Sequence, residues 1–557
     1  MSTKKVSPVM VEIIRNAFIS IAEEMNASML RSAYSPLIYE SKDCSVGIFD
    51  KHARLLGQAA GLPIFLGNLG TCIEILTDKV GLENYKPGDV YMMNDSYLQG
   101  THLTDITVIA PIFYKGELIG FSASRADGGH IGGKDLGPSS DSTNIYQEGV
   151  RIPPVHLVTD GVVNEELLDI LALNSFSHQA RRGDISSQIS ACHKGDQRLC
   201  ELYDKFGKET IEIASEEILR QSEAMDRAAI AQIPDGIYTA EGVIDNDGRN
   251  PEAVPCKVKV IIQGEEMTID LNGSSGPTEG PLNCGKAQTI SACRVAFKQL
   301  INPTAGVTGG NFRNLHVEIP EVSVFNAQEP VACQWYFTTL GLLIDLVVKA
   351  LAEVVPENAA GAHFGDSMVA SFQKFDPKYG KVYHHTDVTV GGWGGFEGGD
   401  GESCVYNATN GDFKNVPVEE LEHKFPLRVL RYAVRENSEG AGKYRGGFGG
   451  IREIYVEDEG NTLCLWLDRA KMTAWGLFGG ESAEAPVVVI NPGTDKEERM
   501  NKVSSYQLHK GDVVCIMTGG GGGFGRPCDR DPQKVKEDLE NGYISPERAK
   551  EVYHYQG

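Results

Sequence analysis

The side chains best suited to bind a metal ion are concentrated in one short part of the sequence. His102 and Asp105 come just before one predicted strand, and Asp127 and His130 come just after the next. If the two strands pair, two imidazoles and at least two carboxylates meet at one edge of a sheet. Such a mixed set suits zinc, manganese or iron(II). The spacing therefore indicates a candidate metal centre.

Spacing alone leaves a second interpretation open, because the pattern His-x-x-Asp is common and these residues stand beside glycines. In that interpretation they are solvated loop residues. Two other groups, His384-His385-Thr386-Asp387 and Cys192-His193, are similar in type but isolated. They are weaker candidates for a metal site.

Other chemistries have little support in the sequence. Gly128–Lys134 and Gly280–Lys286 fit the spacing of a phosphate-binding P-loop, but Asp135 and Ala287 follow where Ser or Thr must ligate magnesium. A nucleotide site is therefore not expected.

No Gly-x-Ser-x-Gly nucleophile elbow and no Cys-x-x-Cys pair is present. The glycines over 519–525 suggest either an anion-binding nest or, more simply, a tightly packed turn.

The elements that must position these side chains follow from hydrophobic periodicity and turn signals. Helices are expected over 8–32, over most of 164–233 with breaks near Asn174 and Phe206, and over 287–300, 335–354 and 531–553. Strands are expected over 45–49, 90–93, 106–112, 118–123, 236–244, 256–262, 266–271 and 513–517.

This order predicts an α+β, multidomain chain. We expect an N-terminal α+β metal-binding domain over 1–233 with a mixed sheet and long helices. It is followed by a mixed α/β middle domain over 234–360. A β-rich, glycine-containing domain over 361–530 and a helical tail over 531–557 come next. The first boundary is placed at the turn Pro234-Asp235-Gly236.

Composition limits the classes of partner. The 557 residues carry a formal net charge of −24, which disfavours general binding to nucleic acid or to anionic membranes. The apolar run Trp335–Val355 contains Asp345 and Lys349, so we expect a buried helix rather than a membrane span. Twelve scattered cysteines and the lack of an apolar leader predict a cytoplasmic protein with reduced thiols.

Several segments together resemble the family of hydantoinase B and oxoprolinase B subunits, which are related to the metal-bearing subunits of acetone and acetophenone carboxylases. The resemblance runs along nearly the whole chain. It is carried by Arg31–Pro36 with Asp43-Cys44-Ser45, by Asn94-Asp95 with Gly100-Thr101-His102 and Asp105, by Gly280–Asn283, by Arg435–Gly450, and by Gly519–Gly525 with Arg530-Asp531-Pro532.

The resemblance implies an ATP-dependent reaction shared between two subunits. A hydantoinase A type partner with an actin-like fold would bind ATP, in a heterotetramer or larger complex. This chain would hold a divalent metal, zinc or else manganese or iron. By position, the implied ligands are Asp43, His102, Asp105 and the residue at 127. Where the family usually has His-x-x-Asp, this sequence has Asp127-x-x-His130, so either of these two residues is a candidate for the fourth ligand.

The implied activity is hydrolysis of cyclic amides such as hydantoins, 5-oxoproline or lactams. ATP on the partner would activate the amide, and the metal would generate hydroxide near neutral pH. Asp43, His102, Asp105 and Asp127 are the expected catalytic residues, and an aspartate that is not a ligand could accept a proton. Two alternatives stay open: a subunit of an ATP-dependent ketone carboxylase, and a non-catalytic scaffold subunit.

Overall fold

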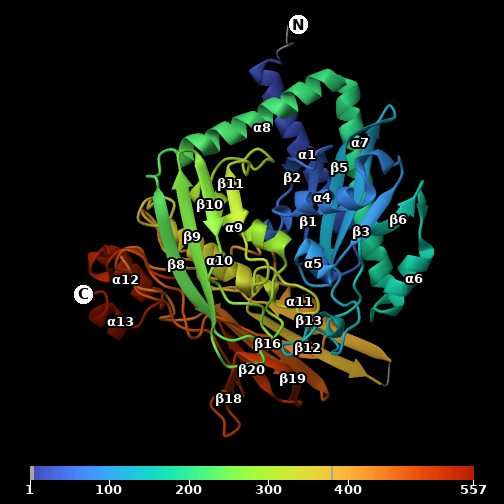
Figure 1. The fold of residues 1–557 in the computed structure, drawn as a ribbon. Helices are drawn as coiled ribbons and strands as arrows, with labels where there is room; N and C mark the ends of the chain where they lie inside the picture. Colours follow the sequence, from blue (N-terminus) through green and yellow to red (C-terminus); the bar gives the residue numbers. More distant parts are fainter. Residues whose placement is uncertain (1–5, 378–379, 557) are drawn as a thin grey trace.

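Four β-sheets with helices packed on them make up the computed structural model, which describes residues 6–377 and 380–556 (Figure 1). The first two sheets follow one another along the chain, and the strands of the last two interleave in sequence; the expected α+β class is confirmed. The expected boundaries at 233 and 360 fall between sheets. The division into domains itself stays a prediction.

The first part of the chain forms a seven-stranded sheet with strand order β2-β1-β5-β4-β3-β6-β7. Its strands are β1 Cys44–Asp50, β2 Leu55–Gln58, β3 Val90–Met93, β4 Asp105–Tyr114, β5 Glu117–Asp127, β6 Val155–Thr159 and β7 Val162–Val163. Its helices are α1 Pro8–Ser32, α2 Pro36–Tyr39, α3 Pro63–Leu66, α4 Leu69–Val80, α5 Ser96–Gln99, α6 Glu165–Leu173, α7 His178–Phe206 and α8 Lys208–Ile230, with 3-10 turns at Leu82–Asn84 and Ile145–Gln147.

Helices cover both faces of this sheet. Alternate residues of β1 contact different cores: Ile48 packs with α1, and Phe49 packs on the other side with α4. This explains why the strand is buried along its whole length. The sheet differs from the expected mixed sheet, because every neighbouring pair in it is antiparallel.

The N-terminal helix begins and ends where the sequence predicts. Ser7 caps α1, with its hydroxyl accepting a hydrogen bond from the Met10 N–H, and Pro8 occupies the first turn. The side chains at helical spacing, from Ile14 to Met29, are buried against the first sheet. The helix therefore closes the core that supports β1 and β5.

The middle part pairs β8 Gly236–Ile244, β9 Val254–Gln263, β10 Glu266–Asp270 and β11 Leu315–Glu318 into a sheet with one parallel pair, β10–β11. Helix α8 runs from the first sheet to this one (Figure 1). The helices α9 Lys286–Leu300 and α10 Tyr336–Leu351 pack beside the sheet, and almost all of α10 is buried. Within the described residues, no helix is long and apolar enough to cross a membrane.

The last part forms two sheets that pack face to face through a common core. One has the order β13-β12-β16-β19, and the other has the order β14-β15-β20-β17-β18. The bounds are β12 Val369–Asp376, β13 Lys381–Val388, β14 Leu427–Val434, β15 Gly450–Val456, β16 Asn461–Trp466, β17 Val487–Ile490, β18 Glu498–Met500, β19 Lys502–Leu508 and β20 Val513–Met517. The helices are α11 Val418–Lys424, α12 Pro532–Glu540 and α13 Pro546–Glu551, with a 3-10 turn at Pro527–Asp529.

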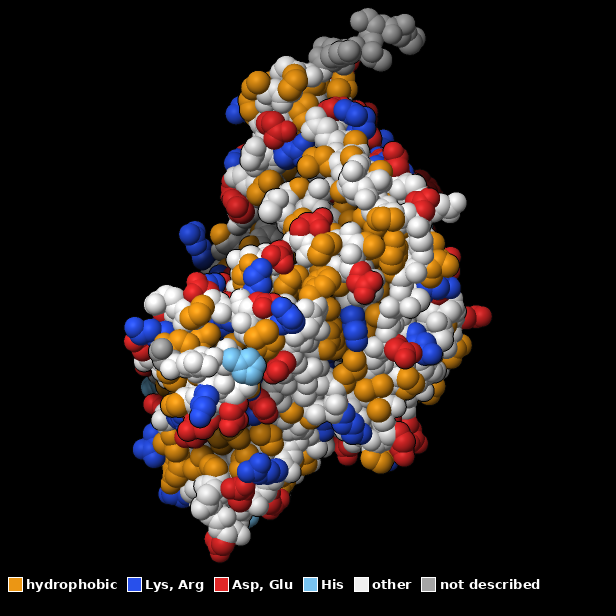
Figure 2. Space-filling view, turned by 90° about the vertical axis from the view of Figure 1, so that its left-hand side faces the viewer, with side chains coloured by type: hydrophobic (Ala, Val, Ile, Leu, Met, Phe, Trp, Pro, Cys, Tyr) orange, Lys and Arg blue, Asp and Glu red, His pale blue; other side chains and the backbone are white. Residues whose placement is uncertain are grey.

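Acidic and basic side chains are interspersed on the face drawn in Figure 2. The acidic excess of the sequence therefore does not collect into one single-signed patch on that face. All twelve cysteines are free thiols, and most of them are buried, which agrees with the expectation of core cysteines.

Glycine segments near the C-terminal sheets are packed against one another backbone to backbone. The N–H groups of Gly521, Gly522 and Gly523 donate to carbonyl oxygens of three other segments, at Gly447, Ala362 and Glu481. These donors are therefore not free to bind an anion, and the interpretation of a tightly packed turn is correct. We call these stacked segments, at 361–362, 391–395, 440–449, 476–481 and 519–525, the glycine layer.

Replacing a glycine of this layer should destabilise the protein. A Cβ atom on Gly394 would lie 1.8 Å from the carbonyl oxygen of Gly361, which is backbone and cannot rotate away. We expect Gly394→Ala to cost about 1–3 kcal/mol or more, as overpacking does elsewhere. Thermal unfolding measures the loss. Gly276→Ala is the control, because a Cβ there meets nothing within 4 Å; equal unfolding temperatures for the two variants would contradict the prediction.

Candidate metal centre

The hairpin of β4 and β5 sets the register of the two central carboxylates. The strands are joined by Lys115-Gly116, both with positive φ, which is the backbone of a tight hairpin turn. One extra residue, Ile119, forms a bulge, and beyond it the register shifts by one. As a result Asp105 pairs with Asp127; without the bulge it would lie opposite Ala126. Both carboxylates therefore project from the same face of the sheet.

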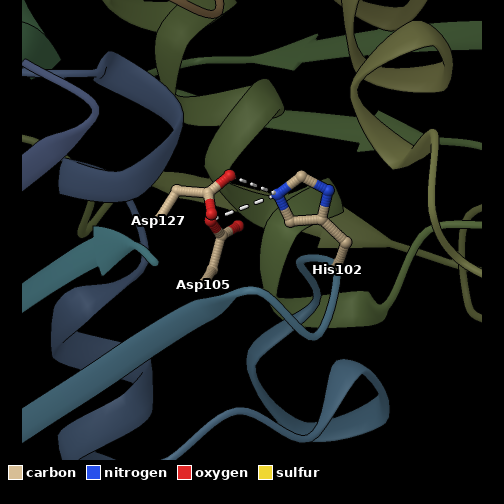
Figure 3. Close-up of side chains that lie close together, drawn as sticks. All are labelled: His102, Asp105 and Asp127. Atoms are coloured by element: carbon tan, nitrogen blue, oxygen red, sulfur yellow. Dashed lines mark ion pairs between the residues drawn. The ribbon is translucent and has the colours of Figure 1, made fainter. Parts of the chain in front are cut away.

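His102 reaches this carboxylate pair from the loop that precedes β4 (Figure 3). Its Nε2 lies 3.2 Å from Oδ1 of Asp105 and 3.5 Å from Oδ2 of Asp127. The ligand atoms of these three residues all lie within 4.8 Å of one another. The loop is fixed by Asn94, whose side-chain amide donates to the Leu103 carbonyl oxygen. The structure thus brings together three of the residues that the sequence singled out.

Asp43 lies beside this cluster and outside the group of three. Its backbone carbonyl oxygen accepts the N–H of Asp127, so the chain before β1 is held against the end of β5. Oδ1 of Asp43 is buried without a hydrogen-bond partner. A buried carboxylate oxygen without a partner is costly unless a proton or cation neutralises it. The mixture of carboxylates and imidazole gathered here suits a divalent cation.

The pKa shifts of Asp43, Asp105 and His102 show how strongly burial and the neighbouring charges act on this cluster. Burial, together with the charges of Asp127 and Asp105, raises the pKa of Asp43 well above its ordinary value. Burial also raises the pKa of Asp105, although His102 opposes it. Burial alone would lower the pKa of His102, but the two neighbouring carboxylates raise it well above its ordinary value. The site therefore favours an added positive charge.

Residues at the start of α10 orient the cluster from a distant part of the chain. Nδ1 of His102 lies 3.2 Å from the Gln334 carbonyl oxygen, and the Tyr336 hydroxyl donates to Oδ2 of Asp105 at 3.3 Å. Donation by Nδ1–H leaves the Nε2 lone pair facing the carboxylates, which is the tautomer a metal ligand needs. The buried Glu148 carboxylate accepts the Gln334 N–H and so holds this peptide in place.

Sequence reasoning missed Gln334, Tyr336 and Glu148 as members of the site. They carry no ligand pattern of their own, and more than two hundred residues separate Tyr336 from Asp105. The sequence predicts the run that contains Tyr336 only as a buried helix, which is correct but says nothing about the metal centre. The available signal for Tyr336 is that a buried tyrosine hydroxyl needs a hydrogen-bond partner.

His130 lies apart from the three-residue cluster. Its ring stacks on Phe176, with ring centroids 3.6 Å apart and planes 19° from parallel, and Nδ1 accepts the Gly132 N–H. Burial lowers the pKa of His130 to about 4, with help from His384 and Arg181. The arrangement favours Asp127 over His130 as the residue nearer the metal position.

The cluster opens into a cavity of about 90 Å³. His102, Asp127 and Asp43 line one side, and the start of α10 and the strands β12 and β13 line others. His384 on β13 lies in this wall, where its Nε2 is 3.0 Å from the Ser371 hydroxyl. The isolated His384 group of the sequence thus belongs to the cavity, although not to the three-residue cluster.

The segment Gly128–Lys134 does not form a phosphate cradle. Its Lys134 ammonium pairs with Asp135 and Asp141, and the Gly128 N–H donates to the Thr104 carbonyl oxygen. These groups of the segment are thus already occupied by the protein and are not free to bind a phosphate.

Known proteins match this chain along most of its length. A sequence model of the family described as Hydantoinase B/oxoprolinase matches residues 7–527. The chain is 31% identical to the B component of a putative D-/L-hydantoinase from Pseudomonas sp. (strain NS671), over 98% of this chain and 94% of that protein.

Two solved structures share the fold. The ATP-dependent caprolactamase from Pseudomonas jessenii superposes with a TM-score of 0.89 at 25% identity, over 99% of this chain and 96% of that one. A nucleotide-free acetone carboxylase superposes with a TM-score of 0.88 at 20% identity, over 98% of this chain and 79% of that one.

The positions of Asp127 and His130 predict different results for their replacement. Asp127→Ala and the isosteric Asp127→Asn remove a charged ligand, so purified protein should lose its metal. His130→Ala removes a ring that stacks on Phe176, so the metal content should stay near that of the wild type. Elemental analysis measures the metal content of the three variants and so distinguishes Asp127 from His130 as the ligand. Metal loss in His130→Ala with retention in Asp127→Ala would show that the assignment is reversed.

The Tyr336 hydroxyl should tune metal affinity without binding the ion. Tyr336→Phe removes the hydrogen bond to Asp105, and we expect the affinity for zinc or manganese to fall on the order of 10–100-fold, as for other residues that orient a ligand. Competition with a chelator measures this change. Tyr97→Phe is a matched control, because it removes a partly buried hydroxyl that donates to the Val331 carbonyl oxygen. An unchanged affinity in Tyr336→Phe would refute the positioning role.

Proposed function

The chain belongs to the hydantoinase B/oxoprolinase family, and we propose that it is the metal-bearing subunit of an ATP-dependent hydrolase that opens cyclic amides. The observation that carries this proposal is the cluster of buried Asp105 with the partly buried His102 and Asp127, set at the wall of a cavity. Relatives in the family are named as hydantoinase and caprolactamase enzymes.

His102, Asp105 and Asp127 would hold the ion, and three protein ligands leave a position open for water or substrate, as catalytic metal sites require. When bound, a divalent ion supplies Lewis-acid activation of water near neutral pH. The resemblance implies Asp43 as a further ligand. We instead assign it the role of proton acceptor at Oδ1, because that atom is buried, unpartnered and outside the group of three.

Other residues of the chain orient these groups and line the cavity. The Gln334 carbonyl oxygen can accept from His102 Nδ1–H in the tautomer that a ligand needs, and the Tyr336 hydroxyl orients the Asp105 carboxylate. The cavity is lined by apolar side chains such as Phe65, Trp335 and Phe413. Apolar walls of this kind strengthen electrostatic interactions with the developing charge of the transition state.

The reaction needs a second protein chain. An amide resists hydrolysis because resonance stabilises its carbonyl and an amine leaves poorly, and activation by ATP would make that carbonyl more electrophilic. The P-loop-like segments of this chain are incomplete, and the relative from Pseudomonas sp. is named as one subunit of its enzyme. We infer an ATP-binding partner of the hydantoinase A type, in a complex with two copies of each chain. The free cysteines fit a cytoplasmic location.

Co-expression with the ATP-binding partner tests this function. We expect ring opening of a cyclic amide such as hydantoin, 5-oxoproline or caprolactam only when both chains, ATP and the metal are present. His102→Ala with Asp105→Ala should abolish turnover. The control pair His509→Ala with Glu459→Ala removes an exposed histidine–carboxylate contact on the surface and should leave turnover unchanged.

Other outcomes identify the alternatives. Incorporation of labelled bicarbonate into a stable product would assign the complex to the ketone carboxylases. Undiminished ring opening by the His102, Asp105 double variant would make this chain a scaffold.

A further inference from the structure

A cavity apart from the metal centre lies between the first part of the chain and α9. It has a volume of about 410 Å³, within the usual range for a small-molecule site. Its lining comes from β1, β2, α3 and α4 of the first part, and from α9 and the loop 303–313 of the middle part. Among the described residues, none lines both this cavity and the metal cavity. We call it the α9 cavity.

Four basic side chains line the α9 cavity, against one acidic side chain. The basic residues are Arg54, Arg294, Lys298 and Arg313, and Glu74 is the single acidic residue among the lining residues that the structure describes. Arg54 and Arg313 are already paired with carboxylates that do not line the cavity, those of Asp50, Glu216 and Glu223. A ligand would therefore meet mainly the charges of the other two cations.

Arg294 and Lys298 keep positive charge that no carboxylate pairs with directly. In the part of the chain that the structure describes, neither makes an ion pair. The Arg294 guanidinium donates to the Gly67 carbonyl oxygen, and the Lys298 ammonium donates to that of Asn302. A guanidinium has five N–H donors and an ammonium has three, so further donors stay available. Glu74 acts on Arg294 only through space.

The spacing of these two cations is unfavourable unless an anion joins them. Arg294 and Lys298 stand four residues apart on α9, so they share one face of the helix, where like charges repel. Burial lowers the pKa of Arg294 and also that of Lys298, because these surroundings disfavour the charged forms. An anion bound between the two side chains would offset both effects.

The rest of the lining suits an apolar body that carries one negative charge. The apolar contributors include Phe49, Leu55, Leu66, Val295, Val307 and Phe312. The Arg294 guanidinium lies over the Phe312 ring, 5.3 Å from its centroid, so the charged and apolar parts of the lining adjoin. Two unpaired cations and the Glu74 carboxylate together leave one positive charge. This balance matches a monoanion better than it matches phosphate.

We propose that the α9 cavity binds a small carboxylic acid anion with an apolar body. The carboxylate accepts hydrogen bonds from Arg294, whose planar fork matches its geometry, and from Lys298. The apolar body packs against Phe312 and the apolar side chains around it. The site is separate from the metal centre, so it needs neither a bound metal nor the proposed hydrolase activity.

Three probes test this site by calorimetry on the full chain: hexanoate, its neutral counterpart hexanamide, and inorganic phosphate. We expect hexanoate to bind with saturation, and hexanamide and phosphate to bind at least tenfold more weakly. A carboxylate could also bind a metal ion, so the titration is repeated with His102→Ala. This variant should keep the affinity for hexanoate.

Lys298→Gln should weaken hexanoate binding about tenfold or more, the scale of one hydrogen bond between charged groups. The matched control is Lys79→Gln, because the Lys79 ammonium also donates to a backbone carbonyl oxygen at 2.6 Å but does not line this cavity. It should leave the affinity unchanged. Arg294→Gln should weaken binding as well. Thermal unfolding shows whether its lost contact with Gly67 disturbs the fold, and Lys298→Gln remains decisive if it does.

The outcomes separate this site from the proposed function. Hexanoate binding that depends on Lys298 and persists in His102→Ala supports the α9 cavity as a carboxylate site, even if the complex opens no cyclic amide. Equal binding of hexanoate and hexanamide would overturn the proposal, because the charge would not be recognised. Tighter binding of phosphate than of hexanoate would overturn it too, as would an affinity for hexanoate that is unchanged in Lys298→Gln or lost in His102→Ala.

Discussion

Two carboxylates held opposite each other at the end of one β-hairpin are the constraint on which the site depends. Asp105 and Asp127 pair directly across β4 and β5. Like charges in this position repel, and burial makes the repulsion stronger. Such a pair is stable in a fold only where a positive charge or hydrogen-bond donors offset the repulsion between the two carboxylates. Here His102 lies between the carboxylates, and the Gly129 N–H donates to Asp127.

The need to cover this hairpin end explains how distant segments of the chain are arranged. The start of α10 lies against His102 and Asp105, and β12 and β13 supply the far wall of the cavity. The glycine layer holds that wall close: the chain passes through the layer at 361–362 just before it enters β12. Because glycine has no Cβ, the backbones of several segments approach one another more closely than side chains would allow. The site is thus assembled from three parts of the sequence.

The fold is largely predictable from the sequence, and the site only in part. Periodicity and caps locate α1, the three helices over 165–230 and the strands that flank the cluster. The meeting of Asp105 and Asp127 is predicted on condition that the strands pair, which they do. The bulge at Ile119, on which the register depends, has no sequence signal of its own. Tyr336 and Glu148 could not be predicted as members of the site, because tertiary packing alone brings them to it.

The same constraint links protonation and metal binding at this centre. Without a metal, the raised pKa of His102 means that its imidazole holds a proton between the carboxylates. A metal ligand must instead be neutral at Nε2, so a divalent ion held by these residues would have to displace that proton. The proton and such an ion would therefore compete for the same cluster. The hydrogen bond from Nδ1 to the Gln334 carbonyl is compatible with both states. The imidazole ring of His102 would therefore keep its orientation when a divalent ion replaces the proton. The contacts from the start of α10 are compatible with both states.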